Sequence, residues 1–308
     1  MSSMTILVLG SGGREHALAL ACHRDPEVAA VHVAPGNPGT ASFATNHPLD
    51  PCDCDAVVSL ARGLEADLVV VGPEAPLVAG VADALRESGI DCFGPSAEAA
   101  QLEGSKAFAK EVMAAARVPT AASRSCDDVN SVSAALDEFG PPYVVKDDGL
   151  AGGKGVVVTH DRAEALAHAE RCFESGHRVV VEEYLDGPEV SLFAICDGTR
   201  ALPMQPAQDF KRVGDGGVGP NTGGMGAYTP LPWAPDDLVE TVSTTIISPA
   251  LRAMADRGTP FVGLLYVGLA LTSAGPKVVE FNVPIADPEP RPQLTNDESS
   301  IAQIKAAR

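Results

Sequence analysis

The sequence has little positive charge. Its 22 lysine and arginine residues are outnumbered by 41 aspartate and glutamate residues, which gives a formal net charge of −19. A protein that recruits nucleic acid by bulk attraction to phosphates needs the opposite balance. Nucleic acid is therefore excluded as an expected partner.

Long hydrophobic runs and a leader-like segment are also missing. No apolar run approaches the roughly 18 residues that cross a bilayer. The sequence passes from Met4 directly into a strand-like stretch, with no basic region or cleavage site typical of secretion. We therefore expect a cytoplasmic protein with no membrane partner.

Paired cysteine motifs are absent as well. Only Cys52 and Cys54 of the seven cysteines lie close together, and a zinc site would need a second such pair. We predict reduced thiols, as in other cytoplasmic proteins.

The sequence does contain enough material for about two domains, with 308 residues of which 45% are apolar. Apolar strands such as 67–72 alternate with helical segments through the first hundred residues. This alternation is typical of a parallel sheet covered by helices on both faces. We expect an α/β protein that opens with a doubly wound parallel-sheet domain.

Helical patterns predict single long helices over 76–88, 96–116 and 236–256. Further apolar strands are predicted at 142–146, 155–159, 178–183, 189–196, 264–271 and 278–281. After Asn282, four prolines and a run of polar residues predict a poorly folded tail.

A glycine-rich turn at 10–16 lies where the first strand passes into a helix. Backbone N–H groups and the helix dipole meet there, which suits a phosphate, and Arg14 adds a forked cation. A dinucleotide fingerprint would need glycine in place of Glu15 and an acidic residue closing the next strand, and the sequence has neither. A plain tight turn is the remaining alternative.

A second glycine-rich loop, 146–155, joins two predicted strands. It is not a Walker loop, because Gly155 follows Lys154 where serine or threonine should hold Mg²⁺, and no helix begins there. Lys146 at a strand end and Lys154 near the loop tip suit a polyphosphate that is covered during transfer. The alternative is a glycine-rich hairpin with solvated lysines.

Two later segments carry carboxylates. A strand that leaves through Gly187 can present backbone groups to a purine edge while Glu189 accepts from both ribose hydroxyls, although an ordinary hairpin has the same pattern. Glu280 and Asn282 are two apart in a strand and so share one face, where they can supply oxygen ligands to Mg²⁺. Solvated residues of an edge strand are the alternative there.

In this order along one chain, the four segments resemble those of the ATP-grasp ligases and, among them, the phosphoribosylamine–glycine ligases of purine biosynthesis. The resemblance covers about residues 5–282 and is most specific in the motifs at 12–17, 72–77, 148–155 and 208–228. It implies an N-terminal pre-ATP-grasp domain over 1–105, then a two-lobed α+β ATP-grasp domain. Its small lobe would cover 106–190 and its large lobe 191–286, with a divergent tail over 287–308.

The resemblance also implies a reaction. Glycine attacks the γ-phosphate of ATP bound with Mg²⁺ or Mn²⁺, and 5-phosphoribosylamine then displaces phosphate from glycyl phosphate to form an amide. The implied partners are these small molecules, without nucleic acid or membrane, and the implied assembly is a monomer.

Residue roles follow from the resemblance position by position. The implied catalytic residues are Lys154, Asp209, Lys211 and Arg212. The implied nucleotide contacts are Lys106, Lys146, Gly152, Gly153, Lys154, Glu182, Glu183, Tyr184, Leu185 and Glu189. The implied contacts of phosphoribosylamine are Gly12, Gly13, Arg14, Glu15, Asn221, Thr222, Gly223 and Gly224, and the implied metal ligands are Glu280 and Asn282.

The sequence also departs from the family pattern. Pro284 stands where the family has an arginine, Phe210 stands where histidine is usual, and family members continue for roughly one more small domain. Two interpretations stay open: a working ligase, or a truncated nucleotide-binding remnant or subunit with reduced or no turnover, which a C-terminal fragment would complement.

Overall fold

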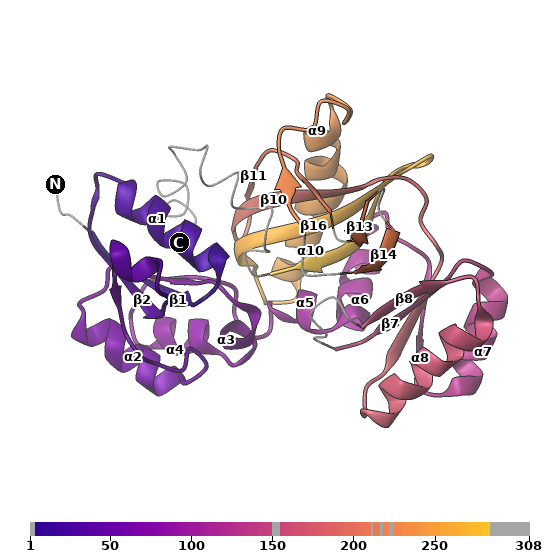
Figure 1. Ribbon diagram of the computed structural model, residues 1–308, viewed down its shortest axis with the longest axis horizontal. Helices are drawn as coiled ribbons and strands as arrows, with labels where there is room; N and C mark the ends of the chain where they lie inside the picture. The colour runs from indigo at the N-terminus through magenta and orange to yellow at the C-terminus, as the bar shows by residue number, and fades with distance from the viewer. Residues whose placement is uncertain (1–3, 150–154, 211, 216–217, 222–224, 284–308) are drawn as a thin grey trace.

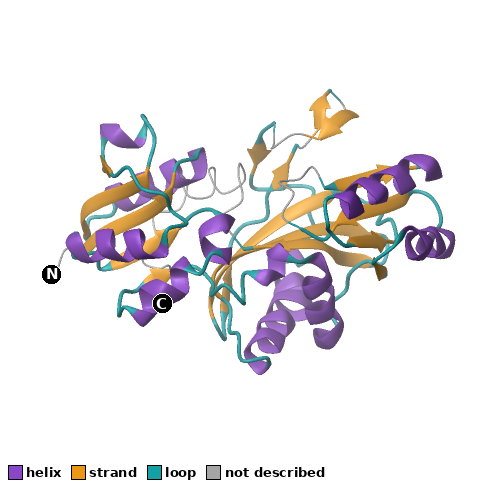
Figure 2. Ribbon diagram, turned by 90° about the horizontal axis from the view of Figure 1, so that it is seen from below, coloured by secondary structure: helices purple, strands orange, loops and turns teal. Residues whose placement is uncertain are grey.

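The computed structural model describes residues 4–149, 155–210, 212–215, 218–221 and 225–283 (Figure 1). The tail predicted over 287–308 lies outside the described residues. None of the helices within these ranges has the length and the apolar character that crossing a bilayer requires. Figures 1 and 2 show a first α/β domain beside a second region, which is built mainly on two four-stranded antiparallel sheets.

The first domain is a five-stranded parallel sheet in the order β3-β2-β1-β4-β5. Its strands are β1 (Met4–Gly10), β2 (Val28–Pro35), β3 (Thr45–Asn46), β4 (Leu68–Val71) and β5 (Cys92–Phe93). Its helices are α1 (Gly13–Arg24), the short η1 (Thr40–Ser42), α2 (Cys54–Gly63), α3 (Glu74–Val78) and α4 (Val81–Glu87).

Alternate side chains of β1 enter two different cores. Ile6 and Val8 pack in the core that contains Leu18 of α1, whereas Leu7 and Leu9 pack in the core that contains residues of α2 and α4. A strand that is buried on both faces has no polar side, which explains the unbroken apolar run in its sequence. The expected doubly wound parallel-sheet domain is therefore confirmed.

The second region contains two four-stranded antiparallel sheets. The smaller-lobe sheet has the order β6-β9-β7-β8 and packs against α7 and α8. Its elements are β6 (Ser123–Cys126), α7 (Val129–Phe139), β7 (Tyr143–Asp147), β8 (Val156–Thr159), α8 (Arg162–Glu174) and β9 (Val179–Glu182).

The larger-lobe sheet has the order β11-β10-β16-β17. Its strands are β10 (Glu189–Asp197), β11 (Ala201–Pro203), β16 (Val262–Thr272) and β17 (Gly275–Asn282). The helices near it are α5 (Gln101–Gly104), α6 (Lys106–Ala116), α9 (Leu238–Val242), the π-helix η2 (Ser243–Ile247) and α10 (Ser248–Asp256). Two short pairs complete the region: β12 (Gln208–Asp209) with β15 (Ala227–Tyr228), and β13 (Arg212–Gly214) with β14 (Val218–Asn221).

The larger-lobe sheet has two different faces. Even-numbered residues of β10, such as Leu192, pack in the core formed with α6, α9 and α10. Odd-numbered residues, such as Phe193 and Ile195, pack instead in the core shared with β1 and α1 of the first domain. The expected α+β region after the parallel-sheet domain is confirmed, whereas its boundaries at 105, 190 and 286 stay predictions.

Two of the three helices expected from the sequence, 76–88 and 96–116, are interrupted, so the prediction of one continuous helix was wrong in each of these two cases. Within 96–116 the break falls at Ser105, whose extended backbone ends α5 and whose side chain accepts from Phe108 N to cap α6. Within 76–88 the break falls at Gly80, which adopts a left-handed conformation with φ +89°.

The third helix stays continuous in direction but changes its hydrogen-bonding pattern. Over 243–247 it becomes a π-helix between α9 and α10. Three consecutive hydroxyl side chains donate there to carbonyl oxygens four residues earlier: Ser243 to Val239, Thr244 to Glu240 and Thr245 to Thr241. Such back-bonding competes with the helix's own hydrogen bonds, which accounts for the locally wider turn.

The connection between the two lobes passes through Gly187. Its φ is +91°, and a Cβ atom at this position would overlap the carbonyl oxygen of Leu271 on β16. The next residue, Pro188, accepts a hydrogen bond from Leu271 N at 3.0 Å. Only glycine therefore lets the chain enter β10 this close to β16.

We predict that Gly187→Ala lowers the free energy of unfolding by about 2–4 kcal/mol, from the left-handed backbone and the backbone overlap together. Gly176→Ala is the matched control, because Gly176 has φ +80° and a Cβ atom there would meet open space. The control should cost only about 1 kcal/mol. Urea unfolding of both variants makes the comparison, and equal losses would contradict the assignment.

Candidate functional site

A pocket opens on the face of the larger-lobe sheet that lies opposite α6 and α10. It brings together three of the residues predicted from the sequence: Glu189, Asp209 and Glu280. The other lining residues are Val190, Ser191, Tyr266, Gly268, Leu269 and Val279. Acidic residues from three separate strands thus line one pocket.

A β-bulge in β17 turns Glu280 toward this pocket. Leu269 pairs with Val278 and Gly268 pairs with Glu280, so Val279 is an extra residue in the strand. The bulge allows Val278 and Phe281, three positions apart, to enter the same core. Glu280 and Asn282 then share the opposite face, as the sequence predicted from their spacing.

The residues around Glu280 fit a hard cation. The Glu280 carboxylate and the Asn282 amide oxygen are the kind of ligands that Mg²⁺ prefers, and Gly268 keeps space open, since a Cβ atom there would lie 3.3 Å from Glu280 Cγ. Among the described residues no group of three or more His, Cys, Asp or Glu side chains could hold a metal ion by itself. This sparse ligand set fits a cation that also takes ligands from water and phosphate.

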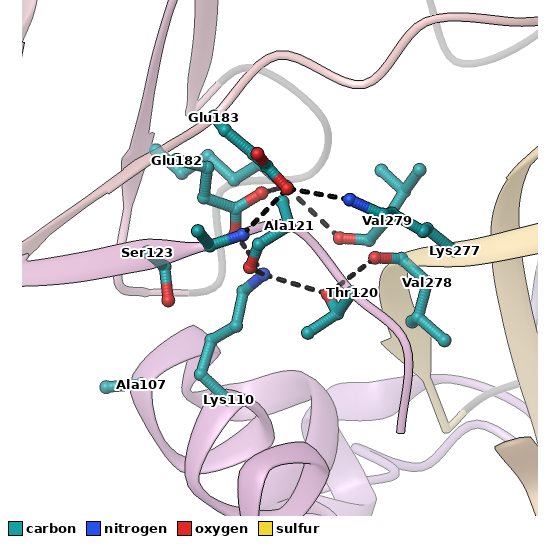
Figure 3. Close-up of polar contacts among 12 residues, drawn as sticks. Ala107, Lys110, Thr120, Ala121, Ser123, Glu182, Glu183, Lys277, Val278 and Val279 are labelled. Atoms are coloured by element: carbon teal, nitrogen blue, oxygen red, sulfur yellow. Dashed lines mark hydrogen bonds and ion pairs between the residues drawn. The ribbon is translucent and has the colours of Figure 1, made fainter. Parts of the chain in front are cut away.

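Lys146 lies next to the pocket and is almost fully buried (Figure 3 shows its partners). Its Nζ atom is 2.9 Å from Glu182 Oε2 and donates to the carbonyl oxygen of Val279 at 3.1 Å. Lys146 belongs to β7 and Val279 to β17, so this ammonium group links the two lobes. The predicted nucleotide lysine therefore reaches the strand that carries Glu280.

The structure distinguishes the two neighbouring glutamates at the end of β9. Glu182 is 3% exposed and points inward to the lysines. Glu183 has different partners: it accepts from Ala122 N at 3.1 Å and pairs with Lys277 of β17 at 2.8 Å (Figure 3). The hydrogen bond from Lys277 holds the pKa of Glu183 below its usual value. Tyr184 and Leu185 follow in the connection to β10, with Tyr184 exposed.

The glycine-rich flap begins against α6. Asp148 Oδ1 accepts from Ala107 N at 2.8 Å and from Ser105 Oγ at 3.2 Å, and Lys106 Nζ donates to the carbonyl oxygen of Gly149 at 3.2 Å. These contacts fix where the flap leaves β7. Its predicted nucleotide contacts Gly152, Gly153 and Lys154 lie outside the described residues.

The glycine-rich turn of the first domain is built around the carboxylate of Glu15. Glu15 is 1% exposed, accepts from Gly12 N at 2.6 Å and pairs with Arg14 Nε. A Cβ atom on Gly10, Gly12 or Gly72 would collide with its side chain. The buried Glu15 side chain thus fixes the backbone of the turn, while Gly12, Gly13 and Arg14 form the part that can face a ligand.

The β12–β15 pair carries Asp209 and is fixed by a chain of hydrogen bonds. Trp233 Nε1 donates to Tyr228 Oη at 2.7 Å, and Tyr228 Oη donates to Gln208 Oε1 at 2.8 Å. Gln208 Nε2 in turn donates to the carbonyl oxygen of Glu189 at 3.3 Å. The ring of Phe210, which replaces the usual histidine, stacks on Tyr228 with 5.9 Å between centroids.

The remaining predicted substrate residues fall within 211–224. Arg212 and Asn221 are backbone partners in the β13–β14 ladder. Lys211, Thr222, Gly223 and Gly224 lie outside the described residues. None of the individual residue roles is tested by these placements, and all of them stay predictions.

Sequence reasoning missed Glu103 of α5, which lies between the first domain and β17. Its Oε2 atom accepts from Val283 N at 2.9 Å. The pKa of Glu103 is raised to about 7, chiefly by burial; the hydrogen bond from Val283 N and the charge of Arg14 oppose this shift, while nearby Glu74 and Glu280 add to it. The glycine-rich turn and the Glu280 strand therefore converge on this carboxyl group, and no motif in the sequence marked it.

The raised pKa of Glu103 predicts a pH-dependent stability. Its contribution is fully present below about pH 4.5 and is lost as the pH rises through about 7, because ionisation is disfavoured in the folded state. Glu103→Gln keeps an acceptor for Val283 N but cannot ionise. We predict that the wild-type protein loses on the order of 2–3 kcal/mol relative to this variant between pH 4.5 and pH 8.

Urea unfolding of both proteins across this pH range, in the presence of a chelator, measures the difference directly. Every other titrating group is common to both proteins and cancels. Parallel stability curves would contradict the prediction.

Comparison with known proteins gives two matching family models. Residues 4–103 match "Phosphoribosylglycinamide synthetase, N domain", and residues 104–290 match "Phosphoribosylglycinamide synthetase, ATP-grasp (A) domain". Together the two models cover most of the chain.

Curated relatives extend this similarity. The phosphoribosylamine–glycine ligase of Mycobacterium leprae is 57% identical over 306 residues, covering 98% of this chain and 72% of its own length. That of Streptomyces coelicolor is 60% identical over 304 residues, covering 99% and 72%. An alignment over 98% of this chain reaches beyond Asn282, where the resemblance seen in the motifs was expected to end.

Solved structures agree with the sequence comparison. The crystal structure of phosphoribosylamine–glycine ligase from Thermotoga maritima has a TM-score of 0.83 and 29% identity, covering 99% of this chain and 76% of its own. The biotin carboxylase domain of the 2-oxoglutarate carboxylase from Hydrogenobacter thermophilus, solved with ADP and magnesium, has a TM-score of 0.78 at 18% identity, covering 100% and 70%. The second likeness concerns the fold alone.

Proposed function

The chain belongs to the phosphoribosylglycinamide synthetase family, and from this premise we propose how the residues of the site act. It is an ATP-dependent ligase of purine biosynthesis, which joins glycine to 5-phosphoribosylamine and yields N1-(5-phosphoribosyl)glycinamide, ADP and phosphate. The observation that carries this conclusion is the 57–60% identity with phosphoribosylamine–glycine ligases over nearly the whole chain. The chain spans 72% of the length of these relatives.

The ATP-grasp fold implies that ATP is the nucleotide, and the buried lysine favours a place for its phosphates. Lys146 uses one N–H toward Glu182 and one toward the carbonyl oxygen of Val279. An ammonium group has three N–H bonds, so one is left for a phosphate oxygen. Lys106 and the flap residues Gly152, Gly153 and Lys154 would cover the same phosphates from the opposite side.

The nucleoside would lie toward Glu189. The chain between β9 and β10, with Tyr184 and Leu185, would line the adenine, and Glu189 at the start of β10 would accept from the ribose hydroxyls. The placement of Glu189 and Glu280 in one pocket supports this arrangement, because one nucleotide would have to place its ribose near Glu189 and its phosphates near Glu280.

Glu280 and Asn282 would hold Mg²⁺ or Mn²⁺ together with phosphate oxygens. When bound, the cation would neutralise the negative charge that develops on the transferred phosphoryl group. The carboxylate oxygens of Glu280, the amide oxygen of Asn282 and the space left by Gly268 support this assignment.

The chemistry needs positioning more than covalent help from the protein. A carboxylate oxygen of glycine attacks the γ-phosphorus, the bond to the β–γ bridging oxygen breaks, and ADP and glycyl phosphate result. The amine of 5-phosphoribosylamine then attacks the acyl carbon, loses a proton, and expels phosphate. Closing the flap would protect the acyl phosphate from water, while Asp209, Lys211 and Arg212 would orient glycine and the intermediate.

The first domain would bind the phosphate of 5-phosphoribosylamine. Backbone N–H groups of Gly13 and its neighbours open α1, and Arg14 adds a guanidinium group. Glu15 would support this phosphate site indirectly, since its carboxylate holds the turn in place through Gly12 N and Arg14. Residues 221–224 would complete this side of the site.

The decisive test of activity is ATP-dependent phosphate release. We expect release only when glycine and 5-phosphoribosylamine are both present, because glycine is needed to form glycyl phosphate and the amine is needed to expel phosphate from it. Folded protein that binds ATP with Mg²⁺ but releases no phosphate would favour the nucleotide-binding alternative over a ligase.

Two carboxylates of the same pocket should respond differently to substitution. Glu280→Gln keeps the side-chain shape but removes a charged ligand, so the Mg²⁺ concentration for half-maximal rate should rise about tenfold or more. Glu189→Gln is the matched control and should raise KM for ATP while leaving the magnesium requirement at saturating ATP unchanged. Magnesium titrations of the rate measure both, and a shift in the control as large as that in Glu280→Gln would refute the assignment.

A further inference from the structure

Lys110 lies in the middle of the polar network between the lobes, although no motif assigned it a role. It is on α6, one helical turn after Lys106, and its side chain is 12% exposed. Its Nζ atom is 3.1 Å from Glu182 Oε1, 2.9 Å from Thr120 Oγ1 and 3.0 Å from the carbonyl oxygen of Ala121 (Figure 3). Three acceptors match the three N–H bonds of one ammonium group.

This saturation separates Lys110 from Lys146. Lys110 has no N–H left over in the described structure, so it cannot reach a ligand without giving up a contact. Lys146 contacts two acceptors among the described residues, so one of its three N–H bonds remains for a ligand. The two lysines are therefore neighbours with different tasks.

Glu182 connects the two lysines. Each of its oxygen atoms faces one ammonium group, Oε1 toward Lys110 and Oε2 toward Lys146. A carboxylate that is only 3% exposed needs positive partners, and Glu182 has one on each side. Without Lys110, Oε1 would have to seek a new donor, and the nearest ammonium group in the described network is that of Lys146.

We infer that Lys110 is a positioning residue for nucleotide binding, acting through Glu182. By occupying Oε1, Lys110 limits Glu182 to a single contact with Lys146, and this keeps one N–H of Lys146 available for the triphosphate. The inference rests on the proposed function, because it takes Lys146 as a phosphate contact.

The same contacts fix the lysines relative to the metal strand. Thr120 Oγ1, which accepts from Lys110, donates to the carbonyl oxygen of Val278 at 2.7 Å, and Lys146 donates to that of Val279. Val278 and Val279 directly precede Glu280 in β17. Lys110 thus sets the phosphate-binding ammonium group and the Glu280 carboxylate at a constant separation.

A double-mutant cycle on nucleotide affinity tests the inference. The Kd of ATP with Mg²⁺ is measured by calorimetry for the wild type, Lys110→Met, Glu182→Gln and the double variant. We expect Lys110→Met to raise Kd about tenfold or more in the wild-type background, equivalent to about 1.4 kcal/mol. In the Glu182→Gln background the same substitution should change Kd by less than about threefold, because Lys110 acts through the missing carboxylate.

Two further variants separate positioning from general damage. Lys277→Met is the matched control, because Lys277 pairs with Glu183, the neighbouring glutamate, and forms no hydrogen bond or ion pair with Glu182 or Lys146 among the described residues. It should change Kd less than about twofold. Lys110→Arg keeps the charge and should retain affinity within about threefold of the wild type, whereas a merely structural lysine would give equal losses for Arg and Met at matched thermal stability.

Each outcome decides the question. An equal loss for Lys110→Met in both backgrounds overturns the inference, since it means that Lys110 acts without Glu182. If Lys110→Met alone does not fold, Glu182→Gln and the double variant are compared, and a tenfold difference between them overturns it. A wild-type protein that binds no ATP would refute the proposed function itself, whereas wild-type binding with unchanged affinity in Lys110→Met refutes only the role of Lys110.

Discussion

A carboxylate removed from water must find positive partners, and this requirement at Glu182 organises the region between the lobes. Ion pairs at this depth contribute little net stability, because desolvation offsets most of their attraction. Burial lowers the pKa of Lys110, and the negative charge of Glu182 opposes that shift. What the arrangement supplies is geometry: α6, β7, β9 and β17 are held at one point by groups that cannot separate without exposing a buried charge.

A second buried carboxylate plays a comparable part in the first domain. Glu15 supports the glycine-rich turn as Glu182 supports the lysines, and in both cases the acid lies behind the groups that can meet a ligand. The β17 bulge then joins these two sides, since it sends Val278 and Phe281 into the core and leaves Glu280 facing the pocket. Glu103, bonded to Val283 N at the end of this strand, closes the gap between turn and strand.

Local chemistry allowed much of this to be predicted. The apolar run of β1 indicated a strand that is buried on both faces, and the spacing of Glu280 and Asn282 indicated that the two residues share one face of their strand. The helix over 96–116 was predicted wrongly, because its propensity is high except at Gly104 and Ser105, where α5 ends and the Ser105 side chain caps α6. The different partners of Glu182 and Glu183 and the role of Lys110 depend on contacts between residues far apart in the sequence, which the periodicity of the sequence does not reveal.

The bridge between Thr120 and Val278 has a consequence for the order in which the chain folds. All five strands of the first sheet lie within the first 93 residues, so that sheet can close while the ribosome is still making the rest. The connector at 119–122 has no such freedom, because its partner is 158 residues further along. In a nascent chain, Thr120 therefore lacks its partner Val278 until β17 has been synthesised. Lys146 likewise gains its contact with Val279 only then.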